Sequence, residues 1–264
     1  MPYSIEIALS IERSLRLPPN LAIALHGAAF RWLDMMGAAQ TYHDDTGAQP
    51  KPFTVSPLVR GGTSASFRLT LLDDSLYEGL RCAIEQRPFV EVPHGTRMAQ
   101  LPIASDPEVT HRSYATLVQG ARTGRHVILS FESPTSFHKD GMDLPLPDAE
   151  HVFASHRRTW NAFVSAELAV PDEWIDWVRC SVAITEHRLW TEEFHLPGHD
   201  HVGCMGVVHY RVPDKVSALP SDLARLNVLA DYAFFCGTGR RTTHGMGQTR
   251  RLEQWRGDSP RERG

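Results

Sequence analysis

The sequence predicts an α+β protein in which two units with the same order of elements follow one another. Residues 3–11 alternate apolar and polar side chains, which is typical of a strand with one buried face. Residues 21–36 repeat apolar side chains every three or four positions, which indicates an amphipathic helix. A similar succession returns after residue 125, and a chain of 264 residues is long enough for two compact domains.

The first unit begins with that strand and that helix. Pro18 and Pro19 end the strand, Asn20 can cap the helix, and Gly37 ends it. After a polar loop, two strands, a second helix and a final strand are predicted at residues 51–58, 67–71, 75–87 and 98–103. Residues 106–125 are less periodic and are interpreted as a connection between domains.

The second unit repeats this order without repeating the sequence. Asp148 can cap the first of its two helices, and Gly237 stands at the end of the second. The predicted elements are strands at 126–131, 178–184, 201–212 and 248–255, with helices at 148–168 and 217–236. This strand-helix-strand-strand-helix-strand order is ferredoxin-like. We therefore predict two tandem ferredoxin-like (βαββαβ) domains at residues 1–120 and 125–256, followed by a basic tail at 257–264.

Charge and cysteine usage limit the class of protein further. Residues 240–264 hold seven arginines and three acids, a formal charge of +4, whereas the rest of the chain carries −8. A polyanionic partner is thus expected to bind locally. The four cysteines lie far apart, which favours reduced thiols and a cytoplasmic location. The amino-terminal segment does not read as a signal peptide, and no apolar run reaches the length of a membrane span, so we expect no membrane role.

The segment 237–247 joins the last predicted helix to the last strand. It combines four glycines with two arginines: Gly237, Gly239, Gly245, Gly247, Arg240 and Arg241. Such a loop can present N–H groups and guanidinium groups to phosphate, and the alternative is a glycine-rich hairpin with solvated arginines. It is not a dinucleotide-binding fingerprint, because Thr242 occupies the third glycine position and a helix precedes the loop.

Four stretches together resemble one family. They are Lys51-Pro-Phe-Thr-Val-Ser56, Phe131-Glu-Ser-Pro-Thr-Ser-Phe137, Arg158-Thr-Trp-Asn-Ala-Phe163 and the glycine-rich segment 237–247. In this order they are similar to the CRISPR-associated endoribonucleases of the RAMP superfamily, which cut precursor CRISPR RNA within its repeats. The resemblance implies binding of CRISPR repeat RNA and cleavage without metal or cofactor, leaving a 2′,3′-cyclic phosphate and a 5′-hydroxyl. A non-catalytic RNA-binding subunit of a CRISPR effector complex is the alternative, and a homodimer is possible.

The resemblance also implies catalytic residues. His43 and Lys51 occupy positions of a family histidine and lysine, so we expect His43 to act as general acid or base and Lys51 to stabilise the transition state. Some members carry a tyrosine on the first helix, where this chain has Phe30, which cannot exchange a proton. His26, one turn away, is the candidate to replace it, although a histidine at that position is also compatible with a structural role.

RNA binding is assigned to arginines and to the glycine-rich loop. Arg240 and Arg241 are expected to hold phosphates together with the loop glycines, and Arg157 and Arg158 on the second-domain helix can extend this track.

One segment suggests a different chemistry. His195, His199, His201 and Cys204 supply enough nitrogen and sulfur ligands for a zinc site. The alternative is a turn that leads into a strand, and the family resemblance supplies no metal at this place.

Overall fold

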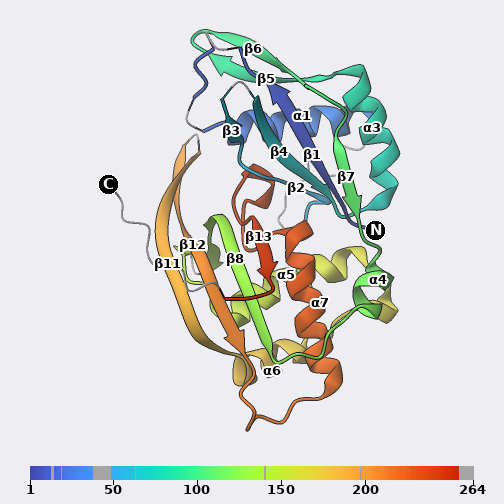
Figure 1. Ribbon diagram of the computed structural model, residues 1–264, viewed down its shortest axis with the longest axis vertical. Coiled ribbons are helices and arrows are strands. Elements are labelled where there is room, and N and C mark those ends of the chain that lie inside the picture. Colours follow the sequence, from blue (N-terminus) through green and yellow to red (C-terminus); the bar gives the residue numbers. More distant parts are fainter. Residues whose placement is uncertain are drawn as a thin grey trace.

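The computed structural model describes residues 1–12, 15–18, 20–37, 49–62, 64–139, 141–196 and 198–255, and His199 by its backbone alone. Its two halves lie one above the other, with segment 237–248 between them (Figure 1). The elements of the first half are β1 (Tyr3–Ser10), α1 (Ala22–Met35), β2 (Phe53–Val55), β3 (Val59–Gly61), β4 (Ser64–Leu71), η1 (Asp74–Leu76), α3 (Tyr77–Gln86), β5 (Phe89–His94), β6 (Arg97–Pro102) and β7 (Glu108–His111).

After α4 (Tyr114–Gln119) the chain enters the second half. Its elements are β8 (His126–Thr135), β9 (Phe137–Lys139), β10 (Met142–Leu144), α5 (Ala149–Phe163), η2 (Ala166–Leu168), α6 (Glu173–Ser181), β11 (Ala183–Leu196), β12 (His199–Arg211), α7 (Pro220–Cys236), η3 (Thr242–His244) and β13 (Thr249–Leu252). The cap predicted for α5 is present, since Asp148 Oδ1 accepts the His151 N–H at 3.0 Å.

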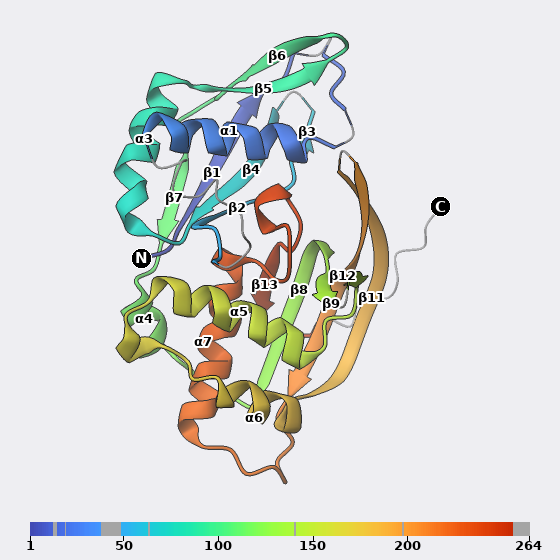
Figure 2. The same ribbon diagram turned by 180° about the vertical axis from the view of Figure 1, so that it is seen from behind.

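Each half contains an antiparallel sheet with ferredoxin-like strand order. The orders are β2-β4-β1-β7, with β3 paired to β4, and β11-β12-β8-β13. In the first sheet β1 lies between β4 and β7, and in the second sheet β8 lies between β12 and β13. The βαββαβ prediction requires this central place for the first strand of each half. Helices α1 and α3 cover one face of the first sheet, and α5 and α7 cover the corresponding face of the second (Figure 2). The α+β class and the tandem ferredoxin-like fold are confirmed.

Two predicted strands differ from the structure. Residues 98–103 fall in a β5–β6 hairpin that forms its own small sheet, and the strand that completes the first sheet is β7. Residues 173–181 form helix α6, where a strand was expected from 178. The reason is that Trp174 and Val178, four residues apart, point together into the second core, so a helical spacing buries both.

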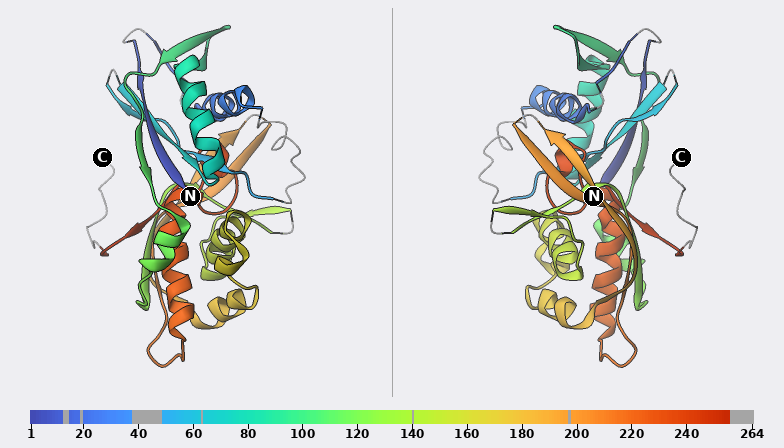
Figure 3. Two further views of the ribbon diagram at one scale, coloured as in Figure 1. Left: turned by 90° about the vertical axis from the view of Figure 1, so that its right-hand side faces the viewer. Right: turned by 90° about the vertical axis from the view of Figure 1, so that its left-hand side faces the viewer.

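Two hydrophobic clusters form the cores. One is built from residues between Ile5 and Leu101, and the other from residues between Tyr114 and Cys236 together with Leu72. The edge views in Figure 3 show the two layers of each half. Helix α4 packs on α7, although it precedes residue 120. The division at residues 120 and 125 remains a prediction. In the described part of the chain, no helix is long and apolar enough to cross a membrane.

Hydrogen bonds join the halves at both ends of the glycine-rich loop. Before the loop, the Phe235 carbonyl accepts the Thr70 hydroxyl at 2.7 Å. After it, the Gln248 side-chain oxygen accepts from Arg68 at 2.8 Å, and its amide nitrogen donates to the Val55 carbonyl at 3.3 Å. Because β2 and β4 supply these partners, the first sheet determines where the loop of the second half lies.

Candidate functional site

The glycine-rich loop packs tightly against the end of β8. Gly237, Gly239, Gly245 and Gly247 all have positive φ angles, between 66° and 93°. A Cβ at Gly239 would lie 2.2 Å from the Ser136 carbonyl oxygen, and one at Gly247 would lie 2.2 Å from the Thr238 carbonyl oxygen. These two positions therefore require glycine for close approach of the backbone as well as for conformation.

Several N–H groups of the loop are engaged within the protein. Gly239 N–H donates to the Ser155 hydroxyl at 2.9 Å, and Arg240 N–H donates to the Ser136 carbonyl at 3.0 Å. Gly247 N–H donates to the Pro134 carbonyl at 3.0 Å. These glycines thus fasten the loop to β8 and α5, and the accessible side chains of the loop are those of Arg240, Arg241, Thr242 and His244.

A cavity of about 420 Å³ opens between the loop, α5 and the residues that precede β2. Four of its lining residues are cationic, and no described lining residue carries a carboxylate. The lining residues are Gln49, Pro50, Lys51, Thr54, Leu72, Ser155, Arg158, Thr159, Cys236, Gly239, Arg240, Arg241, Thr242, Thr243 and His244. Such a cavity favours a polyanionic ligand.

The four expected arginines are held differently. Arg240 pairs with Asp143 at 2.6 Å, and Arg158 is exposed at the cavity wall. The Arg241 side chain is exposed, on a backbone with φ of 58°. Arg157 is turned away, since its guanidinium donates to the Val170 carbonyl at 2.8 Å and pairs with Asp172.

Asp143 connects Arg240 to the sheet. Burial raises the pKa of its carboxyl, but the hydrogen bond with His201 and the charge of Arg240 outweigh that effect and leave the pKa below its ordinary value. His201 Nδ1 lies 2.8 Å from Asp143. Asp143 therefore remains ionised and fixes the direction of the Arg240 guanidinium.

The side of α1 that faces the loop carries a group of aromatic rings. His26 Nδ1 donates to the Thr243 carbonyl at 2.9 Å, and its ring stacks on the His244 ring with centroids 3.8 Å apart. Phe30 contacts His26 with ring centroids 4.6 Å apart, and the Lys51 ammonium lies 5.1 Å from the Phe30 centroid. Residues from both halves thus meet at one place.

The structure brings together most, but not all, of the residues predicted for the site. Lys51, Arg158, Arg240 and Arg241 line the cavity, and His26 contacts its wall through Thr243 and His244. His43 lies outside the described residues. Sequence analysis assigned no role to His244, although its position inside the glycine-rich motif was a signal that could have identified it.

The described side chains of the predicted zinc site do not come together. His195 and Asp200 are register partners on β11 and β12, and His201 pairs with Phe194, which puts His195 and His201 on opposite faces of the two strands. Burial raises the pKa of the Cys204 thiol to about 12, which disfavours the thiolate that zinc binds. Within the described ranges no group of three or more His, Cys, Asp or Glu side chains could hold a metal ion.

Comparison with solved structures establishes the fold. Cas6 (TTHB231) from Thermus thermophilus, solved as a product complex, matches with a TM-score of 0.80 and 23% identity over 96% of this chain and 100% of that chain. A product complex of Cas6 (TTHA0078) matches with a TM-score of 0.78 and 23% identity over the same shares. A RAMP protein that binds different RNA substrates matches with a TM-score of 0.59 and 14% identity, over 96% of this chain and 100% of that chain. At these identities the likeness establishes the tandem ferredoxin-like fold.

A family model matches the sequence of the second half. Residues 129–249, from β8 through the glycine-rich loop, match the family model of the CRISPR-associated endoribonuclease Cas6. The resemblance indicated by the sequence motifs is thereby confirmed. The sequence has no significant match among curated proteins.

Proposed function

We propose that this protein is an endoribonuclease that cuts precursor CRISPR RNA within its repeats. The observation that carries the proposal is the cavity at the loop, which combines four cationic side chains with a stacked pair of histidines at its wall. Cations suit the phosphate backbone, and imidazoles suit proton transfer near neutral pH. The family match of the loop-bearing half supports RNA processing as the activity.

The proposed reaction is a transesterification that needs no metal or cofactor. The ribose 2′-oxygen attacks the adjacent phosphorus while a base takes its proton, so the O2′–P bond forms. The P–O5′ bond breaks as an acid protonates the leaving 5′-oxygen, which gives a 2′,3′-cyclic phosphate and a 5′-hydroxyl. In this scheme His43 and His26 are the candidates for proton transfer, and Lys51 stabilises the charge that develops on phosphorus-bound oxygen.

The RNA partner would be held mainly by arginines. Arg158 and Arg241 are exposed at the cavity, and Arg240 is directed there by Asp143. Gly237, Gly239, Gly245 and Gly247 hold the loop that carries two of these arginines, and Arg157 supports α5 from its other side. Association with a CRISPR effector complex, a homodimer and a cytoplasmic location stay predictions.

The test uses purified protein, a repeat RNA and EDTA. We expect a single cut with a 2′,3′-cyclic phosphate end, and a 2′-deoxy substitution at the cut site should stop cleavage while binding persists. Cleavage of the 2′-deoxy substrate would refute attack by the 2′-hydroxyl. Tight binding with no cut in any repeat RNA would favour the non-catalytic subunit.

A further inference from the structure

We infer that His244, in place of the sequence candidate His26, transfers a proton in the cleavage reaction, and that His26 positions the His244 ring. The inference rests on the proposed endoribonuclease function. His244 lines the cavity together with Lys51 and the loop arginines, whereas His26 is not among the described lining residues. The two rings are nearly parallel, at 19°, with centroids 3.8 Å apart. His26 therefore forms the layer behind the ring that faces the cavity.

Thr243 holds the two rings in different ways. Its carbonyl oxygen accepts a hydrogen bond from His26 Nδ1 at 2.9 Å, and because a carbonyl can only accept, Nδ1 of His26 must carry a proton. Its hydroxyl lies 3.0 Å from His244 Nδ1. A hydroxyl can donate or accept, so it can pair with either neutral tautomer of His244 and with the imidazolium. The Thr243 carbonyl therefore requires a proton on His26 Nδ1, whereas the Thr243 hydroxyl is compatible with every protonation state of His244.

The backbone that carries His244 is held in a defined turn. His244 ends the short helix η3, and its N–H donates to the Arg241 carbonyl at 2.8 Å. Arg241 and Gly245 on either side of η3 both have positive φ, 58° and 93°. A Cβ at Gly245 would lie 3.4 Å from Pro57 N, so the turn packs directly on the first half. This turn, the stack on His26 and the contact with the Thr243 hydroxyl together hold the ring as acid–base catalysis requires of a positioned group.

Cationic side chains line the same cavity as this ring. Lys51 precedes β2, and Arg240 and Arg241 belong to the loop. In the proposed step one imidazole takes the 2′-hydroxyl proton as the O2′–P bond forms. A second, protonated group gives its proton to the 5′-oxygen as the P–O5′ bond breaks. His244 supplies one of these two transfers, and the cations stabilise the negative charge on the phosphoryl oxygens.

The decisive variant is His244→Asn, because an asparagine amide can keep the hydrogen bond to the Thr243 hydroxyl but cannot transfer a proton. We expect single-turnover cleavage to fall by about 100-fold or more, within the usual contribution of general acid–base catalysis. Affinity for the 2′-deoxy repeat RNA should change by less than about threefold. The pH–rate profile should lose one of its two limbs, which a merely structural defect would not remove.

His26→Asn is the matched variant, since its amide can still donate to the Thr243 carbonyl. We expect a smaller loss, of about tenfold, with both limbs of the pH–rate profile retained. Thr243→Val removes the hydroxyl and keeps the carbonyl and the side-chain shape, and it should slow cleavage by about tenfold, whereas Thr243→Ser should restore it. If His26→Asn loses a limb and His244→Asn keeps both, the two roles are reversed and the inference is wrong.

The wild-type protein separates this inference from the proposed function. If wild type cuts repeat RNA and His244→Asn cuts at an equal rate, His244 transfers no proton and the proposed function stands. If wild type, with a melting curve that shows folded protein, cuts no repeat RNA, the proposed function fails and this inference fails with it.

Discussion

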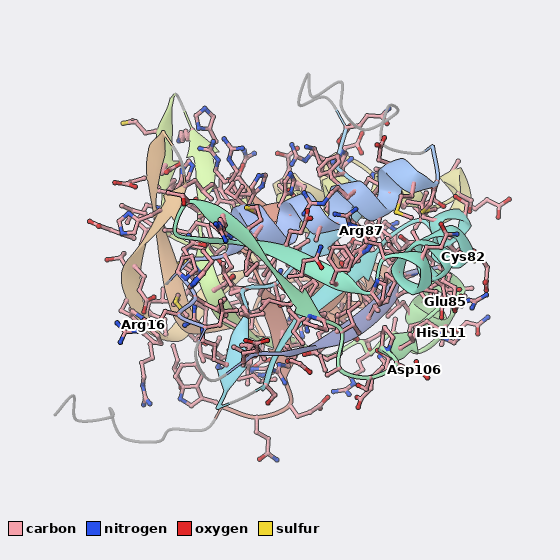
Figure 4. The ribbon with its side chains drawn as sticks, turned by 90° about the horizontal axis from the view of Figure 1, so that it is seen from above. Arg16, Cys82, Glu85, Arg87, Asp106 and His111 are labelled. Carbon is pink, nitrogen blue, oxygen red and sulfur yellow. The ribbon has the colours of Figure 1, made fainter. Side chains whose placement is uncertain are left out.

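In the first half the connection from α3 to β7 turns outward into the β5–β6 hairpin, whereas in the second half the connection from α7 to β13 turns inward as the glycine-rich loop (Figure 1). Figure 4 labels Cys82 and Glu85 on α3, Arg87 just after this helix, Asp106 just before β7, and His111 at the end of β7. Both connections occupy the same place in the βαββαβ order. The fold thus leaves this connection variable, and one half uses it to build the candidate site.

The glycines of the two connections show the difference in packing. Gly95, at the tip of the hairpin, has φ of 60°, and an added Cβ would meet nothing within 4 Å. Gly239 has φ of 79°, and its Cβ would lie 2.2 Å from the Ser136 carbonyl oxygen. The hairpin needs glycine only for its turn, and the loop needs it for contact with the strand below.

The largest expected effect comes from Gly239→Ala compared with Gly95→Ala. At Gly239 the positive φ costs about 1–2 kcal/mol and the clash adds about 1–3 kcal/mol, so the free energy of unfolding should fall by roughly 3 kcal/mol. Cleavage should also be lost. Gly95→Ala should cost about 1 kcal/mol and leave cleavage intact. Urea unfolding measures the stability of the two variants, and single-turnover assays measure their cleavage. If Gly95→Ala loses as much stability and cleavage as Gly239→Ala, the two connections do not differ in their need for glycine.

The second effect concerns a buried histidine beneath the loop. His156 Nε2 lies 2.7 Å from the Thr238 hydroxyl, and burial lowers the pKa of His156 to about 3. The unfolded chain binds a proton at this ring below about pH 6.5, and the folded protein does not. Stability should therefore fall as pH drops from about 6.5 toward 3, by roughly 2 kcal/mol at pH 5. The described buried polar side chains of the first core are instead hydroxyls, on Ser4, Thr54 and Thr70.

His156→Asn isolates this contribution from those of the other histidines. The variant should lose about 2 kcal/mol less than wild type between pH 7 and pH 5 in urea unfolding. If both proteins lose the same amount, His156 is not the group that makes the second half sensitive to acid.

The smallest expected effect separates two neighbouring arginines on α5. Arg158→Ala should weaken binding of repeat RNA by about tenfold and reduce the slope of log affinity against log salt by about 1, because one phosphate contact is lost. Arg157→Ala should leave affinity unchanged and lower stability, since it breaks contacts to Val170 and Asp172. Affinity measured at several salt concentrations checks both. A salt slope that changes only for Arg157→Ala would place the RNA on the opposite side of α5.

The sequence was sufficient to predict the fold class and part of the site. Periodicity predicted both ferredoxin-like halves, but it does not report which strand a segment pairs with, so it could not show that residues 98–103 pair within a hairpin and not with the main sheet. Lys51 and Arg240 were predicted from motifs and do line one cavity. The contact between His26 and Thr243 joins residues 217 positions apart, and no local pattern reports such a contact. Likewise, only the fold shows that Arg157 and Arg158 point in different directions.

The hydrogen bonds of Phe235 and Gln248 to the first sheet have a consequence for how related chains can differ in length. Both ends of the loop are tied to β2 and β4, and its middle is tied to β8 and α5. An inserted residue between 236 and 247 would have to break one of these attachments. The hairpin tip at Gly95 has no such limit in its surroundings. Natural relatives should therefore vary in length at the hairpin and keep a constant number of residues in the loop.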